Sequence, residues 1–311
     1  MTDRCNIRCV YCMPEEVTFL PSSEILSFEE IQRITKQMVG LGINRVRLTG
    51  GEPLVRRELS RLVQSLKSIS GLQDLAMTTN GILLDKHAAD LKRAGLDRLN
   101  ISLDTLDADR FEQLTRRDDL DRALAGIAAA QKAGFEGIRI NAVSMAGLTE
   151  EDIIPMALFC RQNNLELRFI EFMPLDGDEN WQTGNVLRGK EIRDIIESEI
   201  GPLRAKENNY KAQPAKDFEY RDGSGSVGFI DPVSSPFCER CDRLRLTAEG
   251  KLRNCLFSTV EWDLRDPIRD GADDNELESI IRRCVAAKKA GHGIDSTEFQ
   301  RPQRAMYQIG G

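Results

Sequence analysis

Residues 43–53 read INRVRLTGGEP, in which polar and apolar side chains alternate over residues 45–48 and a turn with two adjacent glycines follows. This alternation predicts a strand over residues 43–48. Ser27 and Glu30 have the spacing of a capping box, which predicts a helix from there through Met38. A helix and a strand therefore make the first unit of the fold.

The same unit recurs along the chain. Further strands are expected at residues 75–78, 98–103, 138–143 and 165–172, with helices at 57–69, 84–94, 119–133 and 149–163. Strands that alternate with helices form a parallel sheet wrapped by helices. The expected strands end in the turns TGGEP 49–53, TTNG 78–81, SLD 102–104 and EFMP 171–174. In barrel folds the active-site residues lie at such strand ends. Taken singly, four polar residues in these turns are interpreted as ordinary caps of strand ends: Glu52, Asp104, Thr78 and Ser102.

Cys5, Cys9 and Cys12 have the spacing C-x3-C-x2-C. Three thiolates leave one iron of a [4Fe-4S] cube without a protein ligand, so a small molecule can bind that iron. Structural zinc sites instead favour C-x2-C or C-x4-C pairs and a complete set of four ligands. The spacing therefore favours an open iron-sulfur cluster over a zinc knuckle.

A second cysteine group, Cys238, Cys241 and Cys255, has the spacing C-x2-C-x13-C and again supplies three ligands. Cys160 and Cys284 do not lie at knuckle spacing from it, and both fall on amphipathic helical patterns, where a free cysteine usually behaves as a small buried hydrophobe. A second iron-sulfur cluster is favoured here, and zinc stays the alternative.

Composition indicates the cellular location of the protein and the role of its cysteines. The 311 residues carry a net charge of -7 and eight cysteines, and no apolar run approaches membrane-spanning length. No leader pattern precedes Cys5, so we expect a cytoplasmic protein whose cysteines bind metal rather than form disulfides. The acidic balance argues against general attraction to nucleic acid. The two histidines, His87 and His292, are expected on a helix surface or in a loop.

The length suits one barrel-sized domain with a smaller appended one. We place the boundary at Gly201-Pro202, after an expected helix over 188–200, which gives domains of residues 1–200 and 201–311. Residues 201–236 are rich in Gly, Ser, Pro, Asn and Asp and predict irregular strands and loops. One more helix is expected near residues 274–290.

Arginine binds phosphate through a fork of two hydrogen bonds and keeps its charge. An arginine on a strand can equally be a surface ion-pair partner, so each one alone leaves both interpretations open. Those on expected strands or beside the second cysteine group are Arg45 and Arg47 on one face of the first strand, Arg139, Arg168, and Arg243 and Arg245 on one face after Cys241.

The two cysteine triplets, the Gly-Gly-Glu-Pro turn and the terminal Gly310-Gly311 together resemble the GTP 3′,8-cyclase family of radical S-adenosylmethionine (SAM) enzymes, which begins molybdenum cofactor biosynthesis. TDRCN at residues 2–6 and FCERCDRLRL at 237–246 are specific to the cyclases. The resemblance covers essentially the whole chain. It implies an α/β fold, an incomplete (β/α)6 TIM-like barrel with a C-terminal cluster-binding extension and a cluster at each end of a central cavity.

The resemblance also implies the cofactors and the reaction. Two [4Fe-4S] clusters would be held by the two cysteine triplets, and SAM would bind the open iron of the first. Its reductive cleavage would give methionine and a 5′-deoxyadenosyl radical that takes hydrogen from ribose C3′. The resulting carbon radical would attack guanine C8, leading to 3′,8-cyclo-7,8-dihydro-GTP.

Individual site residues follow from the same resemblance. The SAM contacts would be Tyr11, Gly51, Ser102 and Met173. The nucleotide contacts would be Arg47, Thr78, Arg139, Arg243 and Arg245, and a catalytic role is implied for Arg243, Arg245, Gly310 and Gly311. The family usually has lysine where this chain has Arg139, and a nucleotide-contacting arginine that members carry ahead of the first cysteine has no counterpart in this sequence.

The implied partners are GTP, a reducing electron donor and, downstream, cyclic pyranopterin monophosphate synthase, with neither nucleic acid nor membrane; a homodimer is left open. Two alternatives are weighed. A radical SAM peptide-modifying enzyme usually has more auxiliary cysteines and lacks the Arg243 and Arg245 pair with a Gly-Gly tail. A non-enzymatic iron-sulfur or zinc regulator that binds nucleic acid would want a basic face, which the acidic balance does not offer.

Overall fold

A computed structural model describes residues 1–207, 210, 212–294, 296–297 and 299–310 of the chain. Its main sheet has the strand order β1-β2-β3-β4-β5-β8-β7-β6. From β1 to β5 and on to β8 the neighbours are parallel, and β7 and β6 continue the sheet antiparallel. The strands are β1 (Arg45–Leu48), β2 (Asp74–Thr79), β3 (Arg98–Ser102), β4 (Arg139–Ser144), β5 (Glu166–Glu171), β6 (Leu203–Ala205), β7 (Lys216–Tyr220) and β8 (Ser226–Ile230).

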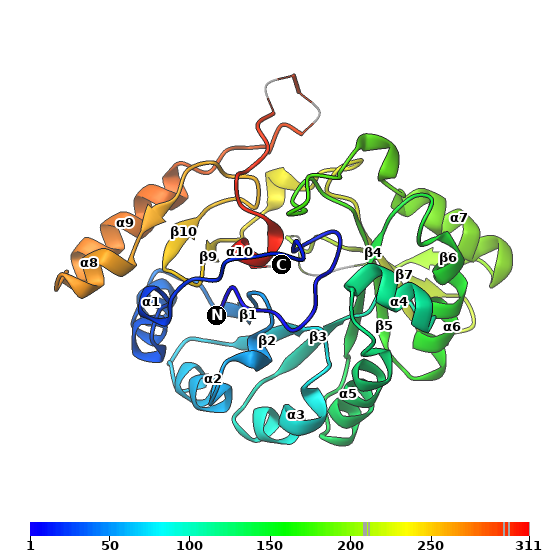
Figure 1. The fold of residues 1–311 in the computed structure, drawn as a ribbon, viewed down its shortest axis with the longest axis horizontal. Coiled ribbons are helices and arrows are strands. Elements are labelled where there is room, and N and C mark those ends of the chain that lie inside the picture. The colour runs from blue at the N-terminus through cyan, green and yellow to red at the C-terminus, as the bar shows by residue number, and fades with distance from the viewer. Residues whose placement is uncertain (208–209, 211, 295, 298, 311) are drawn as a thin grey trace.

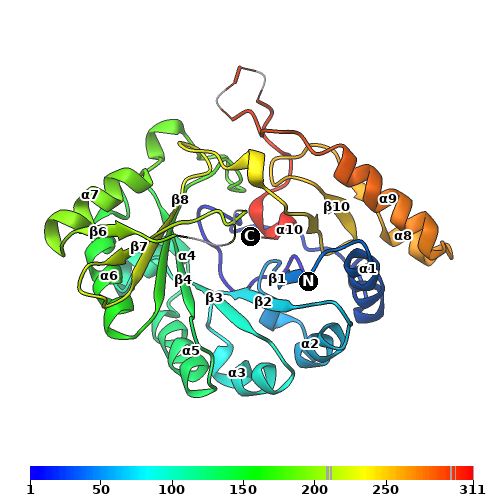
Figure 2. The same ribbon diagram turned by 180° about the vertical axis from the view of Figure 1, so that it is seen from behind.

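Helices form the outer layer of this curved sheet, as Figures 1 and 2 show from its two sides. Within the described residues the sheet does not close on itself, because β1 pairs only with β2 there and β8 continues into β7. The expected incomplete barrel is confirmed. The helices are α1 (Phe28–Gly40), α2 (Leu59–Lys67), α3 (Leu84–Arg93), α4 (Ala108–Thr115), α5 (Leu120–Lys132), α6 (Ile153–Gln162) and α7 (Gly189–Glu199).

Local signals position many of these elements, although not all of them. The capping box before α1 is present: the Ser27 amide donates to Glu30 Oε2 at 2.7 Å, and the Glu30 amide donates to Ser27 Oγ at 3.1 Å. The short helix α4 was not expected from the sequence. The segment 201–236 is more regular than expected, since it forms β6, β7 and the sixth parallel strand β8. The main sheet thus extends past residue 200, and the division at Gly201-Pro202 stays a prediction.

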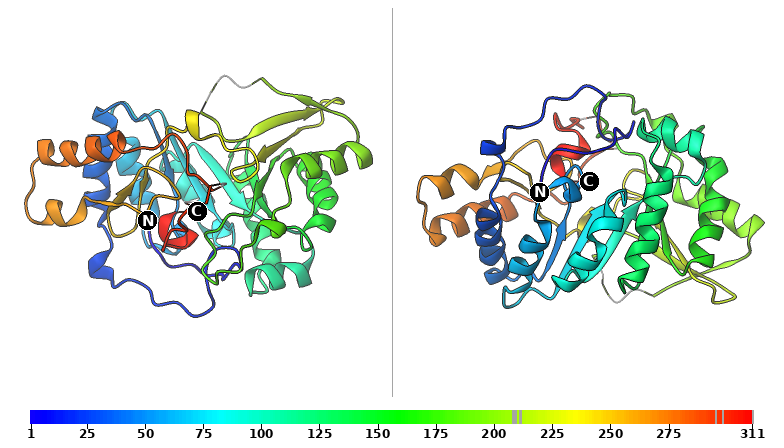
Figure 3. Two further views of the ribbon diagram at one scale, coloured as in Figure 1. Left: turned by 90° about the horizontal axis from the view of Figure 1, so that it is seen from above. Right: turned by 60° about the horizontal axis from the view of Figure 1, so that its bottom comes forward.

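A second, antiparallel sheet of order β11-β10-β9 lies at the open side of the barrel. It consists of β9 (Arg245–Leu246), β10 (Lys251–Arg253) and β11 (Trp262–Asp263), followed by α8 (Arg265–Arg269), α9 (Asp274–Ala286) and α10 (Met306–Ile309). In the views of Figure 3, α10 lies inside the arc of the main sheet, near the chain's beginning. None of the helices in the described part of the chain combines the length and apolar character that crossing a bilayer requires.

The two faces of the main sheet differ in chemistry. The outer face is apolar and packs against the helices, with Leu48, Met77, Leu99, Ile140 and Phe169 in one core. Successive side chains of a strand point to opposite faces of the sheet, so the residues between these apolar ones point to the inner face, where the register brings them together. Parallel strands covered on both faces are usually continuous apolar runs, so this alternation shows that the inner face is not part of the core. Its polar residues are Arg45, Arg47, Asp74, Thr78, Arg98, Asn100, Ser102, Arg139, Asn141, Glu166 and Arg168.

Candidate active site

The first cysteine group lies in one loop that the backbone fixes in place. The amides of Arg8 and Val10 donate to the last carbonyls of α4, Thr115 O at 2.9 Å and Leu114 O at 3.0 Å. The Cys12 amide donates to Cys9 O at 2.9 Å, which closes a turn between these two cysteines. The unexpected helix α4 is thus an anchor of the cysteine loop.

The glycine pair of the TGGEP turn makes room for the segment that leads into this loop. The Gly51 amide donates to Thr2 O at 2.7 Å. A Cβ added at Gly50 would lie 2.4 Å from Thr2 O, and one added at Gly51 would lie 2.3 Å from Arg4 O. Both glycines are therefore required by the close approach of residues 2–4, which is a reason that the sequence did not reveal.

Glu52 of the same turn is buried rather than a solvated cap. Its Oε1 accepts from the Leu54 amide at 2.9 Å and from Thr79 Oγ1 at 2.8 Å, and its Oε2 accepts from the Asn80 amide at 2.8 Å. Burial raises the pKa of Glu52 to about 7, against the effect of these donors. Asn80 in turn directs its side-chain amide at Cys5 Sγ, 3.9 Å away. Glu52 thus joins the ends of β1 and β2 beside the cysteine loop.

The thiols of the first cysteine group are buried, so they need the positive charge of a metal in order to ionise. Burial raises the pKa of the Cys5 thiol to about 11 and that of Cys9 well above its ordinary value, with Cys12 and Cys5 among the groups that raise the latter further. Buried thiols become thiolates when a metal offsets their charge. Tyr11 Oη donates to Asp104 Oδ2 at 2.6 Å, and burial raises the pKa of Asp104 to about 6.

The second cysteine group is assembled from two segments. Cys238 and Cys241 lie in one turn, where the Cys241 amide donates to Cys238 O at 3.0 Å, and Cys255 follows β10. Lys288 Nζ donates to Arg243 O at 2.9 Å and also to Asn254 O, so one ammonium joins both segments. Burial raises the pKa of Cys238, and Cys255 and Cys241 add to the rise.

Each group offers three soft thiol ligands and no fourth cysteine, which fits a cluster with one open iron. Within the described residues, no three or more His, Cys, Asp or Glu side chains are arranged to hold a single metal ion. The other two cysteines, Cys160 and Cys284, are buried in the hydrophobic core as expected. Of the histidines, His87 lies on α3 and His292 lies in the loop beside Cys238.

The inner face of the sheet brings the predicted arginines together. Arg47 forms no ion pair with any described residue, and its side chain stays accessible to solvent although protein surrounds it. Desolvation and repulsion from four other arginines lower its pKa to about 10. These four are Arg98, Arg139, Arg168 and Arg243.

Three of these arginines are partly neutralised by a neighbouring carboxylate. The ion pairs are Arg98 Nε with Asp74 Oδ1 at 2.8 Å, Arg139 Nε with Glu166 Oε2 at 2.7 Å and Arg168 Nη2 with Asp217 Oδ2 at 3.4 Å. The fourth, Arg243, lies over the Phe237 ring at 4.9 Å, and its Nη2 is buried without a hydrogen-bond partner among the described residues. The unbalanced cations Arg47 and Arg243 favour an anionic ligand.

Arg98 was missed as a candidate because its inward direction depends on register with β2 and β4. Arg45, on the same face as Arg47, is exposed and lies over the Tyr210 ring at 4.0 Å. Thr78 and Ser102 are half-buried on the inner face.

The chain end reaches the same region. Arg245 Nη1 donates to Gly310 O, and a Cβ at Gly310 would lie 2.9 Å from Thr49 Cγ2, beside the glycine turn. Burial and then repulsion from Arg243 lower the pKa of Arg245 to about 10. Met173 packs in a cluster with Cys255 and Ile309. Gly311 lies outside the described residues, so its predicted role has no structural account.

Known proteins match this chain over its full length. The model of the radical SAM superfamily matches residues 1–160, and the model described as Molybdenum Cofactor Synthesis C matches residues 165–294. The GTP 3′,8-cyclase of Rhodopirellula baltica is 50% identical over 100% of this chain and 88% of its own. That of Pelotomaculum thermopropionicum is 44% identical over 100% of this chain and 95% of its own.

Among solved structures, SuiB of Streptococcus suis bound to S-adenosylmethionine shares the fold, with a TM-score of 0.58 and 17% identity over 98% of this chain and 72% of that one. Fold, cysteine loop and family match together define a radical SAM enzyme. Within that superfamily, the chain belongs to the GTP 3′,8-cyclase family of molybdenum cofactor biosynthesis, and these relatives favour neither a peptide-modifying enzyme nor a regulator.

Proposed function

We propose that the chain binds SAM and GTP on the inner side of its barrel and converts GTP to 3′,8-cyclo-7,8-dihydro-GTP there. One observation carries the proposal: Arg47 and Arg243, which form no ion pair with any described residue, lie close together beside the tail helix α10, which packs against both cysteine groups. The triphosphate of GTP would balance the charges of those two arginines. The first cysteine group would serve SAM, and the second would serve the guanine of GTP.

The first cysteine group is proposed to hold the cluster that engages SAM. Cys5, Cys9 and Cys12 would bind a [4Fe-4S] cluster, which when bound supplies the electron that cleaves SAM. The proposed SAM contacts Tyr11, Gly51, Ser102 and Met173 lie on the cysteine loop or at strand ends. Asp104 orients Tyr11 through its 2.6 Å hydrogen bond, and the desolvated surroundings exclude water from a reactive intermediate.

The nucleotide is proposed to lie between the arginines and the second cysteine group. Cys238, Cys241 and Cys255 would hold a second [4Fe-4S] cluster, which would offer an open iron for the guanine. Fork-shaped guanidinium groups suit the triphosphate, and Arg139 keeps the charge of the lysine usual in the family. The proposed contacts are Arg47, Thr78, Arg139, Arg243 and Arg245, with Gly310 and Gly311 completing the site.

The pathway context belongs to the same proposal. An external reducing partner supplies electrons, and cyclic pyranopterin monophosphate synthase consumes the product. The reaction takes place in the cytoplasm, and assembly as a homodimer is proposed as the form to test by sedimentation.

Anaerobic reconstitution tests the proposal. With GTP, SAM and a strong reductant, we expect about eight irons per chain and 5′-deoxyadenosine that forms only when GTP is present. Zinc in place of iron, or indifference to GTP, overturns the proposal. Arg47→Gln should raise the KM for GTP by about 10- to 100-fold, because a charged hydrogen bond contributes about 1.5–3 kcal/mol. Arg45→Gln is the control, since Arg45 is exposed and lies against Tyr210.

A further inference from the structure

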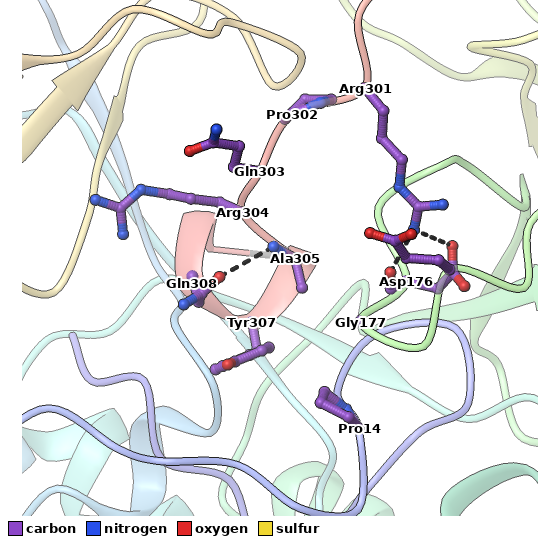
Figure 4. Close-up of a pocket in the computed structure, with 11 residues that line it drawn as sticks. Pro14, Asp176, Gly177, Arg301, Pro302, Gln303, Arg304, Ala305, Tyr307 and Gln308 are labelled. Atoms are coloured by element: carbon purple, nitrogen blue, oxygen red, sulfur yellow. Dashed lines mark hydrogen bonds and ion pairs between the residues drawn. The ribbon is translucent and has the colours of Figure 1, made fainter.

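The final segment, residues 301–310, is held by two sets of ion pairs. At one end, Arg301 Nη2 donates to Asp176 Oδ1 at 2.8 Å and also to Asp176 O, as Figure 4 shows. The Asp176 side chain is 0% exposed and that of Arg301 is 27% exposed. This carboxylate therefore depends on Arg301 for its charge balance.

The second set lies three residues further along, at Arg304, and joins the segment to the small sheet. Arg304 Nε pairs with Glu261 Oε1 at 2.6 Å, and Arg304 also pairs with Glu249. Glu249 lies in the turn between β9 and β10, and Glu261 lies just before β11. Arg301 instead joins the segment to the loop after β5, so the two arginines tie it to opposite sides of the open barrel.

The loop that carries Asp176 is itself packed against the first cysteine loop. A Cβ added at Gly177 would lie 2.3 Å from Pro14 Cδ, so the two backbones are in close contact there. Arg116 Nη2 pairs with Asp178 at 2.7 Å and Arg116 Nη1 donates to Met13 O at 3.3 Å. The position of Arg301 is thereby set relative to the first cysteine group.

From these ion pairs the segment runs between the two cysteine groups. The Met306 amide donates to Leu175 O at 2.8 Å, and the Tyr307 backbone lies beside the Cys12 thiol. Ile309 packs in one cluster with Cys255, and Gly310 O accepts from Arg245. Together with the loop of Asp176 and Gly177, the segment lines a cavity of about 190 Å³ (Figure 4).

We propose that Arg301 and Asp176 are positioning residues whose ion pair keeps residues 301–310 docked, so that Gly310 stays on Arg245 and the segment shields the space between the cysteine groups. This inference rests on the proposed function. Removing one partner leaves a buried charge or polar group uncompensated, which raises the population of undocked segment. Undocking admits water and lets SAM be cleaved without cyclisation of GTP.

The test compares the reconstituted enzyme with Arg301→Gln, Asp176→Asn and the double variant. Arg282→Gln is the matched control, because Arg282 forms an exposed ion pair on α9. One readout is the rate at which trypsin cuts after Arg304, which follows the undocked population. We expect roughly a tenfold increase for Arg301→Gln and no change for the control. The other readout is cyclised product per 5′-deoxyadenosine, which should fall by roughly five- to tenfold.

The variants also show whether the two residues act as a pair. The double variant should be no more susceptible to trypsin than the worse single variant, and Arg301→Lys should restore part of the protection, since it keeps the charge. Additive effects, or unchanged trypsin cleavage in a folded Arg301→Gln protein, overturn the inference. The trypsin readout needs no turnover, so a parent enzyme that forms no cyclised product sinks the proposed function and leaves the docking test standing.

Discussion

The two cysteine groups are built in different ways. The first lies in a single loop, fixed by backbone hydrogen bonds to α4 and by the glycine turn, and Cys9 is buried. The second joins two segments on either side of β9 and β10, and the Lys288 ammonium holds those segments together. A ligand set made from one loop depends on local backbone geometry, whereas a set made from two segments depends on a distant side chain.

The largest effect should come from removing one of the cysteines that are proposed to bind a cluster. Cys12→Ala and Cys255→Ala should each lower the iron content from about eight to about four per chain. Only Cys12→Ala should also weaken SAM binding, by about 10³-fold or about 4 kcal/mol. Iron analysis and calorimetric titration with SAM check this. Equal loss of SAM binding in both variants would contradict the proposal that only the first cysteine group serves SAM.

Lys288→Met should affect the second group alone. It removes two hydrogen bonds from an ammonium to backbone carbonyls, and loss of such supporting contacts lowers metal affinity by about 10- to 100-fold. Chelator challenge followed by iron analysis should show faster loss of about half the iron. Lys289→Met, at an exposed neighbouring position, is the control. Loss of iron from the first group instead would contradict the assignment.

Gly51→Ala should destabilise the fold around the first group. The new Cβ would lie 2.3 Å from Arg4 O, and relief of such overpacking typically costs about 1–3 kcal/mol. Urea unfolding checks this value. Gly40→Ala is the matched control, because a Cβ there meets nothing within 4 Å. A stable Gly51→Ala protein with unchanged iron content would show that residues 2–4 do not need the glycine.

The smallest effect is a pH dependence due to Glu52. Its pKa is about 7 in the folded chain against 4.5 unfolded, so between these values the folded state binds more protons. The contribution of Glu52 to stability is therefore largest at the acid end and is lost as pH rises through about 7. The expected fall is about 1 kcal/mol between pH 5.5 and 6.5. Comparing urea unfolding of the parent and Glu52→Gln should show a shallower slope in the variant; equal slopes would count against a raised pKa.

Local pattern was sufficient to predict much of the molecule. Alternating strands, the Ser27 capping box and both cysteine triplets each lie within a short stretch, so the sequence displays them directly. The fold class follows from these repeats, and family membership agrees with the full-length relatives.

What the sequence could not display depends on residues far apart. Arg98 reaches the inner face only through the register of β3 with its neighbours. Glu52 is buried because Thr79 and Asn80 supply its donors from the next strand. Arg245 donates to Gly310 O although β10, β11 and α9 separate the two residues in the sequence. Each of these contacts is decided by packing, which no local pattern encodes.

The arginines of the inner face also make the fold responsive to its surroundings. Desolvation, and then repulsion from the other arginines, lowers the pKa of Arg47, and this repulsion opposes folding when nothing anionic is bound. A polyanion that binds only the folded chain raises the free energy of unfolding by RT ln(1 + [L]/Kd), about 2.7 kcal/mol at 100 times Kd. The melting temperature of the chain without nucleotide should therefore rise with inorganic triphosphate, so that an anion held by these arginines would also act as part of the folded structure.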